Sequence, residues 1–147
     1  MASREIYNDL LPQVAFNTQL INTDTTTNGV WIDTLGYGLG ILFTGQMGVR
    51  TTGDITPLFE ESDDGGSTSN VVADVNIVPV VVADVLYETG QEVASKLDGS
   101  NEIFSIGLIG TKRHVRLSGV SANTANLTFG AMVHKMGEIR SVYGLVK

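Results

Sequence analysis

Short apolar segments separated by clusters of Gly, Asn and Asp run along most of the chain. The segments are rich in Val, Ile, Thr and Phe, which favour β-strands, whereas the residues between them favour turns. This pattern predicts strands at residues 14–22, 29–35, 39–45, 54–61, 77–83, 103–109, 112–118 and 126–136. Many short strands with turn residues between them are typical of sandwiches and barrels. We therefore predict an all-β fold, a single β-sandwich or jelly-roll-like domain.

The last two predicted strands show the clearest alternation of apolar and polar positions. Val115 and Leu117 are expected to face the core, while Arg116 between them faces outward. Leu127, Phe129 and Val133 of the final strand are likewise expected inside. The polar residues 118–126 between the two strands predict a hairpin loop.

Local signals refine the picture at three places. Asn28 and Gly29 both tolerate positive φ and therefore predict a turn. Pro57 has no backbone N–H to donate, so its strand is expected at a sheet edge or at a bulge. Gly90 interrupts a loosely helical spacing of apolar residues at 86–97. We therefore expect at most one short helix.

Both ends of the chain carry apolar residues outside the main run of strands. Residues 1–13 are expected to form an N-terminal arm, 14–136 the β-sandwich domain and 137–147 a C-terminal arm. Apolar side chains on such arms pack either on their own core or on a neighbouring subunit, and both options stay open. The candidate subunit-interface residues of the arms are Ile6, Tyr7, Leu10, Leu11, Arg140, Val142, Tyr143 and Leu145.

Composition points to a surface with few charges. The chain has 147 residues, enough for one core, and only 17% of them are charged, against the roughly 25% usual for soluble domains. This suits a protein that partners cover, and equally an ordinary β-sandwich. The net charge of −7 argues against nucleic acid as a partner.

The charges are unevenly distributed along the chain. Residues 50–102 carry 11 acidic and 2 basic side chains, whereas residues 112–147 carry 6 basic and 1 acidic side chains. The asymmetry is either chance on a solvated surface or a pair of opposite poles that orients subunits toward each other.

Several classes of protein are disfavoured by the residues present. The absence of cysteine excludes disulfides, thiolate zinc sites and cysteine nucleophiles. No apolar run approaches the roughly 20 residues that span a bilayer, so we expect no membrane partner. The N-terminus lacks the pattern of a signal peptide. We therefore expect a protein that is made and used in a cytoplasm, or assembled there into a particle.

Catalytic and metal-binding patterns are also weak. The acidic residues 60–67 lack the ligand spacing of a calcium-binding EF-hand and indicate a solvated turn. His114 and His134 are expected on outward faces of adjacent strands, without the third ligand that catalytic zinc needs. No nucleophile elbow is present, and nothing selects a pair of catalytic carboxylates. We therefore predict no enzyme, with no cofactor, metal or small-molecule substrate. Trp31 is expected to fill the core, with a sugar-stacking platform as the alternative.

Three short motifs follow one another along the chain. A G-x-x-x-D-x-x-G-Y segment lies at 29–37, and the variant LFEESDDG of an L-x-E-S-D-D-G loop lies at 58–65. A G-x-K-R-x-V-R segment follows at 110–116. In this order, the motifs resemble those of small virion structural proteins of tailed bacteriophages, of the capsid decoration (cement) or head-completion type. The resemblance spans roughly residues 15–135, and the last eleven residues, GEIRSVYGLVK, depart from the pattern.

The resemblance implies a β-sandwich or jelly-roll-like domain on or between major capsid subunits, often as a homotrimer. Its implied partners are the major capsid protein and copies of itself, on the capsid surface of a virion assembled in the host bacterial cytoplasm. The first hypothesis is therefore a capsid decoration protein that stabilises the shell. The alternatives are a head–tail connector or tail component, which the charge asymmetry also suits, and a carbohydrate- or receptor-binding module on the virion surface.

Overall fold

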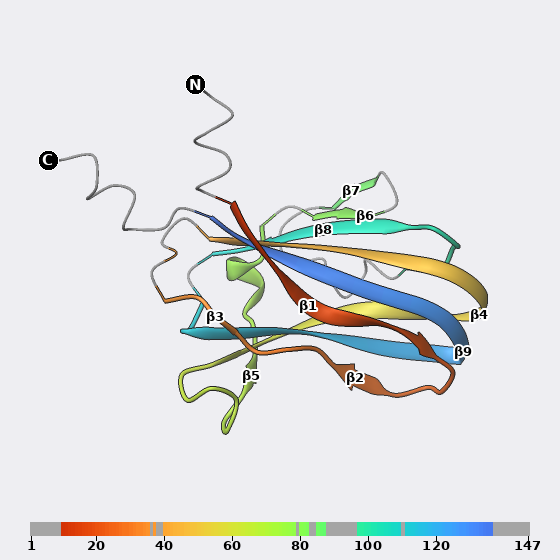
Figure 1. Cartoon of the computed structure of the whole chain (residues 1–147), viewed down its shortest axis with the longest axis horizontal. Coiled ribbons are helices and arrows are strands. Elements are labelled where there is room, and N and C mark those ends of the chain that lie inside the picture. Colours follow the sequence, from red (N-terminus) through yellow and green to blue (C-terminus); the bar gives the residue numbers. More distant parts are fainter. Residues whose placement is uncertain are drawn as a thin grey trace, which may run out of the picture.

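The computed structural model of the chain consists almost entirely of β-strands (Figure 1). It describes residues 10–35, 37, 40–78, 80–82, 85–87, 97–109 and 111–136. The strands are β1 (Leu10–Ile21), β2 (Thr26–Asn28), β3 (Ile32–Asp33), β4 (Ile41–Ser62), β5 (Asn70–Val71), β6 (Val80–Val82), β7 (Val85–Tyr87), β8 (Ile103–Leu108) and β9 (His114–Met136). One 3-10 turn, η1 (Asp74–Asn76), interrupts them. The predicted all-β fold is confirmed, and the described residues contain no helix of the length and apolarity that crossing a membrane requires.

Two long strands form the centre of the molecule. β4 and β9 are antiparallel partners from Ile41 opposite Lys135 to Ser62 opposite His114. Both strands bend in the middle and run back, so each contributes to two facing layers (Figure 1). The first layer has the order β1-β9-β4-β8-β6-β7, and the second adds β2, β3 and β5 to the other halves of β4 and β9. The sandwich is therefore one continuous sheet folded over itself.

The bend arises from irregular pairing at one point of the two long strands. The register between β4 and β9 shifts three times between Met47 and Asp54. On the facing strand, Asn123 and Thr124 adopt positive φ angles of 62° and 61°. Bulges of this kind bend a strand and increase its twist. The irregular stretch therefore turns the first layer into the second.

The predicted hairpin loop at 118–126 is wrong, because β9 continues through it. Its two serines, Ser118 and Ser121, are buried and hydrogen-bond to other parts of the chain. The Ser121 hydroxyl lies 2.8 Å from the Thr23 carbonyl oxygen and 2.9 Å from that of Thr25. It also accepts the Thr25 N–H, at 3.1 Å. Ser121 thus ties β9 to the connection before β2.

The predicted turn at Asn28 and Gly29 is also wrong, because β2 and β3 both run along β9. Between them, the Gly29 N–H donates to the Leu117 carbonyl (3.0 Å) and the Val30 N–H donates to the Ala15 carbonyl (2.8 Å). A Cβ atom on Gly29 would lie 2.3 Å and 2.4 Å from these carbonyl oxygens of Ala15 and Leu117. Glycine is needed here because two backbones approach it closely.

The edge or bulge position predicted for Pro57 holds only locally, because β4 has partners on both sides and a regular register from Asp54 to Ser62. On the side away from β9, Ile55 exchanges backbone hydrogen bonds with Leu97, and the Phe59 carbonyl accepts the Val72 N–H at 3.0 Å. Pro57 lies between these two contacts and shares their side of the strand. Its missing N–H therefore breaks no hydrogen bond between β4 and β9.

The core lies between the two layers and contains all five phenylalanines of the chain, each at most 1% exposed. The rings of Phe43 and Phe59, from the two halves of β4, have centroids 5.1 Å apart. Phe129 contacts Phe16 at 5.0 Å and Phe104 at 5.9 Å. The inward positions predicted for Val115, Leu117, Leu127, Phe129 and Val133 are confirmed, since all are buried. Aromatic contacts across the core therefore hold the folded sheet closed.

The ends of the described chain lie together. Leu10 begins β1 opposite Met136, the last residue of β9, and Leu11 lies opposite Lys135. The sheet thus begins before the predicted residue 14 and ends at the predicted residue 136. Candidate interface residues Ile6, Tyr7, Arg140, Val142, Tyr143 and Leu145 lie outside the described residues, as does most of the candidate helix at 86–97.

Candidate protein-binding surface

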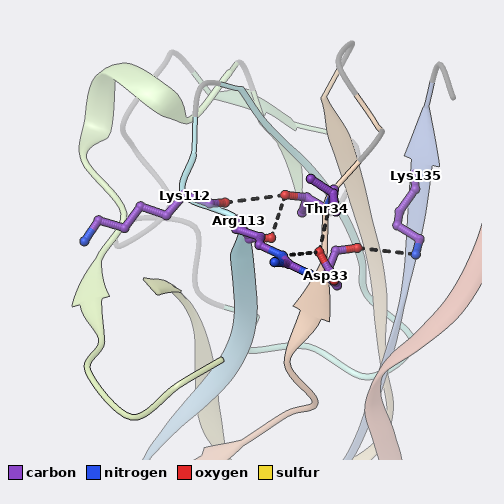
Figure 2. Close-up of polar contacts among 6 residues, drawn as sticks. Asp33, Thr34, Lys112, Arg113 and Lys135 are labelled. Carbon is purple, nitrogen blue, oxygen red and sulfur yellow. Dashed lines mark hydrogen bonds and ion pairs between the residues drawn. The ribbon is translucent and has the colours of Figure 1, made fainter. Parts of the chain in front are cut away.

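Two of the three sequence motifs, those at 29–37 and 110–116, meet at one end of the sandwich (Figure 2). The Arg113 guanidinium binds the Asp33 carboxylate with two hydrogen bonds, of 3.2 Å and 2.9 Å. Thr34 donates its hydroxyl and its N–H to the Arg113 carbonyl, at 2.7 Å and 2.8 Å. From the far end of β9, the Lys135 ammonium lies 3.5 Å from the Asp33 carbonyl oxygen. We call Asp33, Thr34, Arg113 and Lys135 the end clamp.

The acidic loop is fastened to the same end. The Glu61 carboxylate accepts the Lys112 N–H at 3.0 Å, and the Lys112 ammonium lies 3.4 Å from Asp63. Within the loop, the Ser62 hydroxyl donates to Asp64 at 2.7 Å and accepts the Gly66 N–H at 2.9 Å. The solvated turn predicted for residues 60–67 is confirmed from Asp63 onward, but Glu60, Glu61 and Ser62 belong to β4.

Glu60 is the most heavily bonded carboxylate of this region. Its Oε2 atom accepts the Nε and Nη2 protons of Arg116 at 3.0 Å and 2.7 Å, and the Ser118 hydroxyl at 2.8 Å. The side chains of Glu60 and Arg116 are both 16% exposed. Ser118 also contacts the Asn28 side chain at 3.1 Å. This group therefore ties β4, β9 and β2 together on the outer side of the second layer.

The prediction that Trp31 fills the core is wrong. Trp31 lies on the outer side of the second layer, next to Arg116. It is half-buried, and Arg116 lies over its ring at 4.5 Å from the ring centroid. A Cβ atom on Gly66 would lie 2.2 Å from the Trp31 Nε1 atom, so the loop packs directly on the indole. Ile32, the next residue, takes the buried position instead. With a cation on one face, the ring is a poor platform for a sugar.

Two ion pairs join the acidic and the basic stretch of the sequence. Glu60 and Asp63 come from the acidic stretch, and they pair with Arg116 and Lys112 of the basic stretch. These pairs use two of the 11 acidic and two of the 6 basic residues, so both interpretations of the asymmetry, chance and opposite poles, stay open.

The two histidines lie apart in one strand, β9, so the prediction that they lie on adjacent strands is wrong. His114 is in the second layer opposite Ser62, and His134 is in the first layer opposite Leu42. The Nδ1 atom of His114 is buried and has no hydrogen-bond partner among the described residues. Those residues also contain no group of three His, Asp or Glu side chains placed to hold a metal ion.

A groove of about 610 Å³ runs over the outer face of the first layer. Val14 of β1 lies directly opposite Met132 of β9, and Ile103 of β8 lies opposite Gln46 of β4. Val14, Met132 and Ile103 are 49%, 46% and 53% exposed. We define the groove by the residues that line it, which are Val14, Phe16, Asn17, Thr18, Thr44, Gly45, Gln46, Gly48, Ile103, Thr128, Gly130, Ala131, Met132 and His134.

The lining of the groove is apolar or neutral. Over the part of the chain that the structure describes, no Asp, Glu, Lys or Arg side chain lines it, although the protein has a net charge of −7. An uncharged face with exposed apolar side chains is typical of the centre of a protein-binding surface. Sequence reasoning missed it because its three exposed apolar side chains, Val14, Ile103 and Met132, are far apart in the sequence and lie on three separate strands.

No protein family model matches the chain, and no curated protein matches its sequence. The structure is similar to the crystal structure of the SPBc2 prophage-derived protein YomS, with a TM-score of 0.49 and 16% identity over 86% of this chain and 93% of that one. A likeness at this level carries no argument about function.

Proposed function

We propose that this chain is a structural virion protein of a tailed bacteriophage, a decoration protein that binds and stabilises the shell of major capsid protein. The groove carries the proposal, because an uncharged face exposing Val14, Ile103 and Met132 suits a protein partner better than a substrate. The motif resemblance supplies the class of partner. Docking on shell subunits is non-covalent and requires no catalytic residue.

The end clamp and the hydrogen-bonded group of Glu60, Arg116 and Ser118 support a structural role for the motifs. Their charged side chains bind one another, as Asp33 binds Arg113 and Glu60 binds Arg116. The motifs therefore fix loops and strands at one end of the sandwich. A rigid sheet that presents a fixed face loses little conformational entropy on binding. Many copies on a shell would then hold through modest individual affinities.

The alternative functions have less support among the described residues. The connector or tail hypothesis drew on opposite charge poles, and four of those charges pair within the molecule. The receptor-binding hypothesis needed a free aromatic platform, but Arg116 covers Trp31 and the Lys135 ammonium lies 4.6 Å from the centroid of the Tyr37 ring. The decoration hypothesis keeps its supporting surface. The same proposal includes assembly of this chain as a homotrimer on the capsid surface.

Attachment to purified heads that lack the protein tests the proposal. Met132→Asp places a carboxylate in the groove, and burying it without a partner should weaken attachment at least ten-fold. Val75→Asp is the matched control, because Val75 is 78% exposed in η1, outside the groove. The control should attach like the unaltered chain.

Two results would contradict the proposal in different ways. Equal attachment of both variants would mean that the groove is not the docking surface. If the unaltered chain itself failed to attach to heads, the capsid would not be its partner.

A further inference from the structure

Asn28 and Gly29 form the one Asn-Gly pair in the sequence. An asparagine side chain is open to attack by the backbone nitrogen of the next residue, and glycine presents that nitrogen without a Cβ in the way. In this reaction the Gly29 N–H loses its proton, and the nitrogen bonds to the side-chain carbonyl carbon of Asn28, which releases ammonia. Water then opens the succinimide ring. Breaking the new bond gives aspartate, and breaking the original peptide bond gives isoaspartate.

In the folded chain, the attacking nitrogen is held by neighbouring backbone. The Gly29 N–H donates to the Leu117 carbonyl of β9 at 3.0 Å, and the next N–H, that of Val30, donates to the Ala15 carbonyl at 2.8 Å. Space beside Gly29 is also lacking, since a Cβ atom there would lie 2.3 Å and 2.4 Å from these two carbonyl oxygens. Turning the Gly29 nitrogen toward the Asn28 side chain therefore requires the pairing with β9 to open.

The strand that carries Asn28 is short and exposed. β2 has three residues, of which the first and the last are exposed, and it pairs with β9. The Ser121 hydroxyl fastens the connection before β2, with contacts of 2.8 Å and 2.9 Å to two of its carbonyl oxygens. Segments with few buried side chains open locally at a lower free energy than the core. β2 can therefore release Gly29 while the rest of the sheet stays folded.

The products of the reaction fit their surroundings poorly. The Asn28 side-chain oxygen lies 3.1 Å from the Ser118 hydroxyl, whose single proton Glu60 also accepts at 2.8 Å. An aspartate at position 28 places a second carboxylate beside this proton, and like charges at such a distance repel each other. Isoaspartate lengthens the main chain by one methylene, which shifts the residues that follow out of register with β9. Either product hinders β2 from pairing again.

We propose that Asn28 is a site of spontaneous deamidation, which the pairing of β2 with β9 prevents and which becomes reactive when β2 opens. Water is the only co-reactant. When opening and closing are fast, the rate of the reaction follows the fraction of molecules that are open. Because the products hinder closing, the reaction makes a reversible opening permanent. This site is separate from the groove and does not depend on the partner that docks there.

Deamidation of the full chain in mildly alkaline buffer tests the proposal, with the masses and retention times of peptides containing residue 28 as the readout. The folded chain should react at Asn28 about ten times more slowly, or slower still, than the same chain in concentrated urea. Ser121→Ala removes the fastening before β2 and should speed the reaction in the folded chain roughly three-fold or more. Ser100→Ala is the matched control, because its hydroxyl bonds to the Arg50 N–H at the bend (3.2 Å).

Hydrogen exchange of the Gly29 amide gives a second measurement that needs no variant. The proton that exchanges is the one that the reaction removes. In the unaltered chain at low urea concentrations, exchange at Gly29 and deamidation at Asn28 should therefore rise in parallel. The effect of the product is measured with Asn28→Asp, which should lower the urea midpoint. Asn17→Asp adds the same charge on the groove lining, which contains no Asp or Glu, and should lower the midpoint less.

Four results would overturn the proposal. Deamidation at Asn28 as fast in the folded chain as in urea would mean that the fold gives no protection. No deamidation in urea would mean that Asn28 is not a reactive site. Equal rates for Ser121→Ala and Ser100→Ala, or deamidation that does not follow exchange at Gly29, would mean that opening of β2 does not control the reaction.

Discussion

Glu60 offers the sharpest test of how the outer side of the second layer is held together. The substitution Glu60→Gln keeps the size of the side chain and removes its charge. In the structure, one carboxylate oxygen accepts two hydrogen bonds from Arg116 and one from Ser118, all between 2.7 and 3.0 Å. The substitution leaves the Arg116 guanidinium without its anion while the contact with Trp31 remains.

The expected magnitude follows from the burial of the pair. Hydrogen bonds to charged groups contribute about 1.5–3 kcal/mol each, and removing one partner of a fully buried ion pair costs about 3–5 kcal/mol. Glu60 and Arg116 are each 16% exposed, so some solvent reaches the remaining charge. We therefore expect Glu60→Gln to lower the free energy of unfolding by about 2 kcal/mol. That is a large share of the 5–15 kcal/mol typical of a domain.

Urea unfolding measures the effect, with the fluorescence of Trp31, the sole tryptophan, as the signal. The control is Asp63→Asn, because the pair of Asp63 and Lys112 is 71% and 36% exposed and should contribute less than about 1 kcal/mol. A double-mutant cycle with Arg116→Gln isolates the pair itself. If Glu60→Gln costs no more than Asp63→Asn, the reasoning is refuted and Glu60 is an ordinary surface residue.

Two further predictions concern pH and close packing. Hydrogen bonds from Arg113 to Asp33 and from Ser62 to Asp64 lower the pKa of each carboxyl to about 2. Both ionised carboxyls therefore stabilise the fold above pH 4, and this stabilisation is lost as the pH falls toward 2. Asp33→Asn should accordingly lower the urea midpoint at pH 7 but not at pH 2. An equal lowering of the midpoint at both pH values would contradict this. Gly29→Ala should destabilise the protein by about 3 kcal/mol or more in thermal unfolding, because backbone oxygens lie 2.3 and 2.4 Å from the new Cβ. At the control position Gly48, the atom nearest to a new Cβ lies 3.5 Å away, so Gly48→Ala should change stability by less than about 0.5 kcal/mol. Similar effects of Gly29→Ala and Gly48→Ala would argue against the close packing around Gly29.

Periodicity was enough to predict the strand content and the buried faces. Val115 and Leu117 alternate with polar neighbours, and their burial depends only on which face of the strand meets the core. The length of the strands could not be predicted in the same way. Residues 118–126 look like a loop because they are polar, but their partners are far away in the sequence. Ser121, for example, bonds to Thr25, 96 residues earlier.

The candidate site was predictable only in part. The motifs identified Asp33 and Arg113, but nothing local indicates that residues 80 positions apart bind each other. The groove had no sequence signal, since Val14, Ile103 and Met132 come together only through the pairing of β1, β9, β4 and β8. Exposed apolar residues are common singly, and only their placement on one uncharged face makes them informative.

The copy number of this chain in purified phage particles tests the central claim most directly. Quantitative mass spectrometry against the major capsid protein gives the ratio. The account predicts a ratio near one to one, or one trimer at each threefold position of the shell, which amounts to hundreds of copies. Absence from full heads, or only a handful of copies per particle, would contradict a decoration role, and a handful would favour a connector or tail position.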